Sequence, residues 1–205
     1  TAAWKEKRIG VPWQKGETLS IAIGQGFNLA TPIQMVGMTA AIANNGTRYK
    51  PIILDSIKTS DGRVLHQSEP QVVGKLPVSA STLELVKKGL WAVVNSDTGT
   101  ARGSRLADFE ISGKTGTSQV ISRKKDDEKT DEDLPPHLRP HAWFVAYAPS
   151  DEPVIAVAVV VEHGEHGSGA AAPIAKEIIK TYLRTGWPVH QMAKEQDRLG
   201  DGESS

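Results

Sequence analysis

The sequence predicts an α+β fold in which helices pack on an antiparallel sheet of three C-terminal strands. Ala142–Ala148 and Val154–Val161 are apolar on both alternations, which is typical of strands with both faces covered. The polar connector Pro149–Pro153 between them is short enough to join neighbouring antiparallel strands. A third candidate strand, Ile111–Val120, precedes them along the chain. An amphipathic segment that begins at Ala172 predicts a helix lying across this sheet.

The composition is that of a globular protein. The chain has 205 residues, 39% apolar and 23% charged, which suits one domain with a core or two very small ones. Its 24 basic and 24 acidic residues balance, and this argues against a nucleic-acid partner, since such proteins usually carry a basic excess. No apolar run is long enough to span a membrane. The chain begins with threonine and has no signal peptide, which predicts a processed protein or an excised piece.

The first helix that the sequence predicts begins at Thr31. Thr31 is a suitable N-cap, Pro32 suits the first helical position, and Gln34 completes a capping box. Apolar residues then recur at helical spacing up to Asn44, where asparagine and glycine suit the end of a helix. The preceding Gly24–Gly26 permits a tight turn, but a lone G-x-G motif is weak evidence for a phosphate site.

A hairpin and a second helix are expected next. Pro51–Leu54 and Val64–His66 flank a Ser-Asp-Gly turn, which predicts two paired strands. Ser81 and Glu84 form a capping box for the second helix. The buried stripe of this helix is expected to consist of Leu83, Val86, Leu90, Val93 and Val94.

Two polar segments are expected at the surface. Residues 122–140 contain a basic and then an acidic run with few groups to bury, which predicts a mobile loop. Residues 187–205 are also polar and predict a disordered tail, so the domain is expected to cover residues 1–186.

The segment Ser112–Ser118, with the sequence SGKTGTS, is the strongest candidate site. The ammonium of Lys114 supplies a fixed positive charge, and the hydroxyls of Thr115 and Thr117 can hydrogen-bond a carboxylate. Gly116 leaves room for a ligand backbone, and a backbone N–H just beyond it can serve as an oxyanion donor. Strict alternation places Lys114 and Thr115 on opposite faces, so both reach one ligand only at a twisted sheet edge. The alternative is a plain surface strand with Lys114 in solvent.

Two other chemistries fit the sequence less well. A nucleotide-binding P-loop shares the Gly-Lys-Thr element, but it needs a glycine where this chain has Asp108 and a helix after the motif. Glu162–Gly167 contains two histidines and two glutamates that could hold a metal, yet its surroundings predict a loop, which rarely fixes three ligands. The sequence therefore predicts neither a metal nor another cofactor, and without cysteine it can form neither disulfides nor thiolate metal sites.

Taken together, the motifs resemble those of the penicillin-binding proteins. Gly113–Thr117, followed by an apolar strand pair, resembles the K-T-G element of these enzymes and of the serine β-lactamases. Ile23–Gly26 and Ala30–Met35 resemble the G-Q-G and A-T-P-x-Q-M segments of class B penicillin-binding proteins. With His141–Pro149, the chain resembles the monofunctional peptidoglycan transpeptidases of cell elongation, and the resemblance extends from Ile21 to Leu183.

This resemblance implies a serine-type D,D-transpeptidase with a penicillin-binding-protein and serine β-lactamase-like fold. Such enzymes attack the D-Ala-D-Ala end of a peptidoglycan stem peptide, form an acyl-enzyme and pass the acyl group to an amine. β-Lactams acylate the same serine. The resemblance implies that Lys114 joins the active-site hydrogen-bond network and binds the substrate carboxylate together with Thr115, Gly116 and Thr117. It also implies that the Thr117 backbone N–H completes the oxyanion hole.

Two of the family's three motifs are not where the family has them. The family needs S-x-x-K, which carries the nucleophile and the general base, and then S-x-N, both before K-T-G. This sequence has no S-x-N, and its single S-x-x-K, Ser122–Lys125, follows K-T-G in the charged segment. The resemblance therefore implies that the chain is the C-terminal portion of a transpeptidase domain. It is expected to lack the nucleophile and general base and to be inactive alone.

The resemblance also implies a location and partners. The parent protein is expected on the periplasmic side of the bacterial inner membrane, with a glycan-strand polymerase and the elongation machinery, and the lack of cysteine suits export. In this fold, strands from the N-terminal side pair with Val154–Val161, so the chain alone is expected to self-associate through that edge. Two alternatives stay open, a β-lactamase or D,D-carboxypeptidase relative and a non-catalytic interaction module. The G-Q-G and A-T-P-x-Q-M segments argue against the first.

Overall fold

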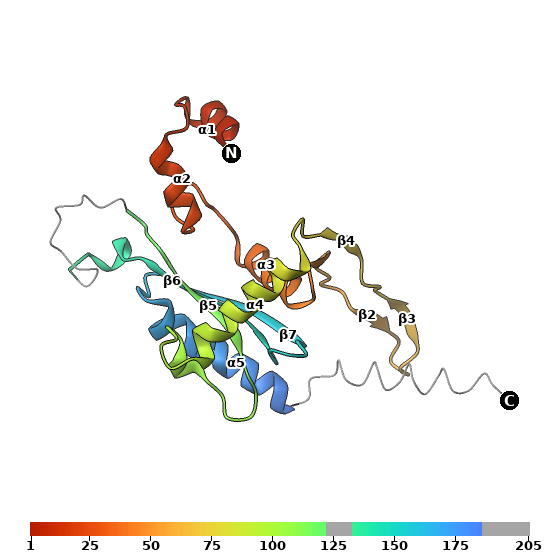
Figure 1. Ribbon diagram of the computed structural model, residues 1–205. Helices are drawn as coiled ribbons and strands as arrows, with labels where there is room; N and C mark the ends of the chain where they lie inside the picture. Colours follow the sequence, from red (N-terminus) through yellow and green to blue (C-terminus); the bar gives the residue numbers. More distant parts are fainter. Residues whose placement is uncertain (122–132, 186–205) are drawn as a thin grey trace.

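In the computed structural model, which describes residues 1–121 and 133–185, helices pack on a three-stranded antiparallel sheet (Figure 1). The helices are α1 (Ala2–Ile9), α2 (Lys15–Ala22), α3 (Pro32–Ala43), α4 (Ala80–Asn95) and α5 (Ala172–Thr185). The strands are β1 (Thr47–Tyr49), β2 (Ser56–Lys58), β3 (Val64–Gln67), β4 (Val72–Lys75), β5 (Ser112–Ser118), β6 (His141–Ala148) and β7 (Ile155–Val161). The short turns are the 3₁₀ helices η1 (Arg102–Ser104) and η2 (Pro136–Leu138) and the π-helical η3 (Gly167–Ala171). The predicted α+β class is confirmed.

The strand β6 is the centre of the sheet, whose strand order is β5-β6-β7. Both pairings are antiparallel, and the register of β5 runs from Ser112 opposite Tyr147 to Ser118 opposite His141. Phe144 and Tyr147 lie on opposite alternations of β6 and are both buried, as predicted for a strand with two covered faces. Within the described residues β7 is an outer strand, so its second edge has no strand beside it. Self-association through that edge stays a prediction.

The helix α5 packs on β6 and β7, as the sequence predicts. Its buried stripe of Ala172, Ala175 and Ile179 is 0% exposed, whereas Ile174 and Ile178 on the neighbouring stripe are about half-exposed. The core cluster around this contact comprises Val94, Ala101, Ile111, Ala142, Phe144, Ala146, Ala148, Val157, Ala171, Ala172, Ala175 and Ile179. Burial of these apolar side chains is the main source of stability for the sheet, because it removes their surface from water.

The caps of α3 and α4 differ in how well local sequence predicts them. In α3, the Thr31 hydroxyl accepts the Gln34 N–H and the Gln34 side chain accepts the Thr31 N–H, which confirms the capping box. In α4, the predicted box of Ser81 and Glu84 is wrong, since the helix begins at Ala80. Extended backbone precedes Ala80, and the Ser79 hydroxyl accepts the Thr82 N–H as N-cap. The helix α4 also buries fewer of its apolar side chains than predicted.

The stripe predicted for α4 is buried at its two ends. Leu83 is 7% and Val94 0% exposed, whereas Val86 is 40% exposed and Leu90 and Val93 are intermediate. Val94 and Val93 pack in the core beside the sheet, so the C-terminal end of α4 anchors the helix near β5.

The predicted hairpin exists, but its first strand is shifted. The strands β2 and β3 pair antiparallel, and the turn closes where the Thr59 N–H donates to Arg63 O. Gly62 adopts φ 90° in this turn, a left-handed conformation that favours glycine. Because the turn closes at Thr59, the residues just before it form the strand, and the prediction of Pro51–Leu54 is wrong. A second antiparallel pair, β1 with β4, lies between the β2–β3 hairpin and α3.

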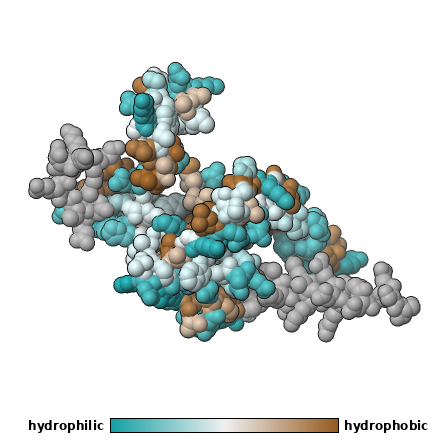
Figure 2. Space-filling model, in the orientation of Figure 1, coloured by the Kyte–Doolittle hydropathy of each residue, from teal (hydrophilic) through white to brown (hydrophobic). Residues whose placement is uncertain are grey.

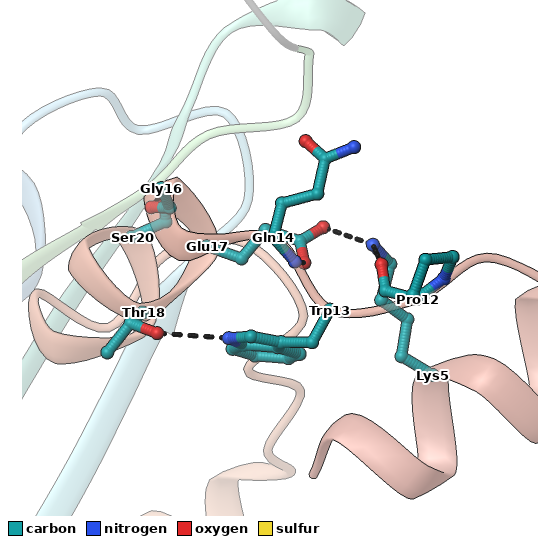
Figure 3. A network of polar contacts seen from close by, with 8 residues as sticks. All are labelled: Lys5, Pro12, Trp13, Gln14, Gly16, Glu17, Thr18 and Ser20. Atoms are coloured by element: carbon teal, nitrogen blue, oxygen red, sulfur yellow. Dashed lines mark hydrogen bonds and ion pairs between the residues drawn. The ribbon is translucent and has the colours of Figure 1, made fainter.

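The helices α1 and α2, which the sequence patterns did not predict, are held together by a nearly buried ion pair (Figure 3). Lys5 is 3% exposed, and its ammonium donates to Pro12 O at 2.9 Å and to Glu17 Oε1 at 2.5 Å. The Gln14 N–H donates to the other oxygen of Glu17 at 2.7 Å. The Lys5 ammonium also lies 5.5 Å from the centre of the Phe27 ring, a cation–π distance. The lysine is thus buried with its charge fully paired.

We expect the contact between α1 and α2 to weaken in acid. The hydrogen bond from the Gln14 N–H and the bond from Lys5 hold the pKa of Glu17 below its ordinary value. A lowered pKa in the folded state stabilises the fold above the unfolded value of about 4.3, and this stability is lost as pH falls through the lowered pKa. The NMR signal of the Trp13 indole N–H, which donates to Thr18 Oγ1, should report this opening between pH 7 and pH 3.

The matched control for this prediction is Glu17→Gln. A glutamine side chain can still accept the Gln14 N–H but does not titrate, so its Trp13 signal should stay constant over the acidic range. An acid transition that is the same in both proteins would show that Glu17 is not its cause.

Apolar side chains gather at the surface around α2 (Figure 2). Leu19 is 74% and Ile23 77% exposed, and Leu29 in the segment before α3 is 87% exposed. In the ranges 1–121 and 133–185, no helix is long and apolar enough to cross a membrane. The predicted tail 187–205 and residues 122–132 of the predicted loop, which include Ser122–Lys125, lie outside the described residues. The described remainder of the predicted loop contains η2.

Candidate active site

The candidate site lies along the outer edge of β5, where the strand turns backbone groups away from β6. Thr115 O accepts a hydrogen bond from Lys114 Nζ at 2.9 Å, and Thr117 O accepts one from Gln25 Nε2 at 2.7 Å. Neither partner belongs to β6, so both carbonyls point outward. The N–H and C=O of one strand residue point to the same side, so the N–H of Thr117 also faces the open edge. β5 is an outer strand within the described sheet.

The ammonium of Lys114 and the hydroxyl of Thr115 meet at this edge. Lys114 Nζ lies 3.2 Å from Thr115 Oγ1, although the two residues alternate along the strand. The side chain of Lys114 is exposed and reaches round the edge to its neighbour, the arrangement that the sequence required if both were to meet one ligand. Thr100 adds a third polar group, with its hydroxyl 3.4 Å from that of Thr115. Among the described residues, Lys114 Nζ bonds to Thr115 and to no serine.

The backbone of β5 at Gly116 is covered by the π-helical turn η3. A Cβ added to Gly167 would lie 2.2 Å from Trp143 O and 2.8 Å from Gly116 O, so glycine is the only residue that fits. A Cβ on Gly116 itself would lie 3.1 Å from the Cβ of Trp143. The two glycines let η3 rest directly on the β5–β6 pair beneath the candidate site.

Within Glu162–Gly167, His163 and Glu165 contact neighbouring protein groups. The Glu165 carboxylate is paired with Arg139 at 2.8 Å. The backbone N–H of His163 donates to His141 Nδ1 at 3.0 Å, and the two imidazole rings are 4.8 Å apart. These contacts tie the segment after β7 to the start of β6. In the described part of the chain, no group of three or more such side chains is placed to hold a metal ion.

The sequence interpretation missed the contact of Gln25 with this site. The G-Q-G segment supports only the resemblance to the family, and no local pattern connects it to a strand 92 residues later. A polar side chain between two glycines is the one signal in the sequence that could have drawn attention to it.

The chemistry that this edge supports is the binding of an extended, carboxylate-bearing chain. A cation and two or three hydroxyls can hold a carboxylate, and an outward N–H can stabilise an oxyanion. The edge is open to an extended partner because one side of β5 has no strand beside it in the described sheet.

Comparisons with known proteins agree on one family of transpeptidases. A family model described as the penicillin binding protein transpeptidase domain matches residues 4–180. The peptidoglycan D,D-transpeptidase MrdA of Haemophilus influenzae is 37% identical over 191 residues, which cover 92% of this chain and 29% of that protein.

Solved structures agree with the sequence comparison. The structure of Pseudomonas aeruginosa PBP2 in complex with WCK 5153 is similar with a TM-score of 0.68 and 38% identity, over 89% of this chain and 37% of that one. A complex between PBP2 and MreC from Helicobacter pylori has a TM-score of 0.66 and 30% identity, over 89% of this chain and 30% of that one. The chain thus spans less than a third of the length of the curated relative from Haemophilus influenzae.

Proposed function

The chain belongs to the penicillin-binding protein transpeptidase domain family, and we propose that it supplies the K-T-G part of a peptidoglycan D,D-transpeptidase. The proposal rests on the open edge of β5, where the Lys114 ammonium bonds to the Thr115 hydroxyl and the Thr117 backbone faces outward. The resemblance of the chain to MrdA proteins favours the elongation-type enzyme.

In this proposal, residues 114–117 bind the end of a stem peptide. The Lys114 ammonium attracts the terminal carboxylate, the hydroxyls of Thr115 and Thr117 hydrogen-bond it, and the small Gly116 leaves space beside the strand. The scissile carbonyl then points its oxygen at the Thr117 N–H, which stabilises the negative charge of the tetrahedral intermediate.

The covalent steps need a serine that we place outside these 205 residues. Its oxygen attacks the carbonyl carbon of the D-Ala-D-Ala bond while a general base takes its proton, and the C–N bond breaks as that proton passes to the leaving nitrogen of D-alanine. The amine of a neighbouring stem peptide then attacks the acyl-enzyme and loses a proton to the base. The C–O bond to the serine breaks, the serine oxygen takes up that proton, and the cross-link is formed. Because S-x-N is missing from the sequence and S-x-x-K follows K-T-G, we propose that the chain is inactive alone and that residues 1–186 form the C-terminal part of the domain.

We also propose a location and partners for the parent protein. The similar PBP2 of Helicobacter pylori was solved in complex with MreC, which supports a partner of that kind for this chain's parent. The proposal places the domain on the periplasmic side of the inner membrane, where it meets its peptidoglycan substrate and β-lactams and works with a glycan-strand polymerase.

The proposal is tested by labelling the full-length protein that contains this chain with a fluorescent penicillin. We expect one stable covalent adduct, and peptide mass spectrometry should locate it on a serine outside these 205 residues. An adduct on Ser122 or on any other serine of this chain would overturn the assignment of the nucleophile. Rapid hydrolysis of the penicillin with no lasting adduct would instead indicate a β-lactamase.

A further inference from the structure

We propose that Gln25 is a positioning residue that fixes the orientation of the Thr117 backbone N–H at the open edge of β5. The inference rests on the proposed function, in which that N–H is an oxyanion donor. Gln25 itself touches neither substrate nor nucleophile in this proposal. It acts by holding the carbonyl of the same residue, Thr117 O, through its side-chain amide at 2.7 Å.

The backbone of Gln25 is itself held at the end of α2. Its N–H donates to Ser20 O at 2.9 Å, and the Gly24 N–H donates to Ile21 O at 3.0 Å. Gly24 and Gly26 have φ of 78° and 69°, so left-handed backbone flanks Gln25 on both sides and side chains other than hydrogen would be strained there. The turn therefore presents the glutamine side chain from a defined place.

A second amide in the same segment stabilises the turn from within. Asn28 Nδ2 donates to Ile21 O at 3.0 Å, the same carbonyl that accepts the Gly24 N–H. This bond closes the segment on α2 and does not reach β5. The segment thus contains one amide side chain that bonds to the turn and one that bonds to the candidate site.

The contact matters because the outer edge of β5 lacks the strand that would otherwise fix its backbone. Within the described sheet, the inward groups of the strand are held by β6, whereas the outward carbonyls of Thr115 and Thr117 bond to the side chains of Lys114 and Gln25. The Thr117 N–H lies along the edge between these two carbonyls. With both neighbouring peptide groups held, the direction of this N–H is fixed before a ligand arrives, which is the preorganisation that an oxyanion donor requires.

The side chain at this position must be a hydrogen-bond donor. A glutamine amide donates to the Thr117 carbonyl, whereas an ionised glutamate can only accept and would face a carbonyl oxygen with a negative charge. A protonated glutamate has one O–H and can donate again. The substitution Gln25→Glu therefore breaks the contact at neutral pH and restores it in acid, with almost no change in shape.

The experiment measures acylation of the full-length protein by a penicillin in stopped flow, which separates the dissociation constant of the initial complex from the acylation rate constant. For Gln25→Glu at pH 7.5, we expect the acylation rate constant to fall about tenfold, because the oxyanion donor is misdirected but not lost. The dissociation constant should change less than about threefold, since the groups that bind the carboxylate are intact.

The pH dependence and a matched variant separate positioning from general damage. As pH falls towards about 4.5, the introduced carboxyl is protonated, and the ratio of variant to unsubstituted rate constants should rise towards one. Gln34→Glu makes the same amide-to-acid change away from β5, and a glutamate still accepts the Thr31 N–H, so its ratio should stay within about twofold of one at pH 7.5.

The outcomes distinguish this inference from the proposed function. If the unsubstituted protein forms no penicillin adduct, the proposed function fails. If that protein is acylated but Gln25→Glu and Gln34→Glu slow acylation equally, or if acid does not restore the first variant relative to the unsubstituted protein, the positioning role is refuted and the proposed function stands.

Discussion

Replacing Gly167 with alanine is expected to slow penicillin acylation about a hundredfold and to lower the free energy of unfolding by about 3 kcal/mol. The added methyl group would lie 2.2 Å from Trp143 O and 2.8 Å from Gly116 O. Both neighbours are backbone atoms of paired strands, so no change of rotamer can make room. Either η3 lifts off the sheet or β5 shifts beside Lys114, and both displace the candidate site.

The control for this prediction is Gly169→Ala in the same π-helical turn. A Cβ at Gly169 has no atom within 4 Å, and its φ is not left-handed, so the substitution should leave the melting temperature equal or slightly higher and the acylation rate unchanged. Thermal unfolding and stopped-flow acylation of the full-length protein measure both effects. Equal behaviour of the two alanine variants would contradict the close contact of η3 with the sheet.

Replacing Lys114 with methionine is expected to lower the second-order acylation constant of the full-length protein by about a hundredfold or more. Methionine keeps most of the length of the side chain but removes the charge that, in the proposed function, attracts the ligand carboxylate and joins the hydrogen-bond network. The side chain is exposed and, within residues 1–121 and 133–185, bonds only to Thr115, so the melting temperature should hardly change.

Lys75→Met is the matched control for the charge. Lys75 is also an exposed lysine on a strand, at the end of β4, and its loss should leave acylation unchanged. Acylation by Lys114→Met that stays within about threefold of the unsubstituted rate would remove Lys114 from the proposed machinery, because a lost charge-assisted hydrogen bond costs more than that.

The elements that the sequence predicts well are those whose signals are local and strong. The apolar strands β6 and β7, the capping box of α3 and the amphipathic α5 each follow from neighbouring residues. The helix α1 gives no such signal, because it buries Lys5, a residue type that usually faces water. Its burial depends on Glu17 and Pro12 O, which only the folded chain brings to the ammonium.

In the candidate site, too, the sequence predicts what depends on local residue type and misses what depends on contacts between distant residues. Residue type was enough to single out Lys114 and Thr115, and the edge position of β5 explains how neighbours on opposite faces can meet. Gln25 and Gly167 could not be found that way. They reach β5 from distant parts of the chain, through one hydrogen bond and one backbone contact that no periodicity encodes.

The contact of Gly167 with Gly116 has a mechanical consequence. Where side chains separate two elements, a small movement of one can be absorbed by rotamer changes in between. Here main chain rests on main chain, so we expect a displacement at the start of the C-terminal helix to reach β5 through η3 with little loss. The helix on the sheet and the edge that carries Lys114 are therefore expected to move together.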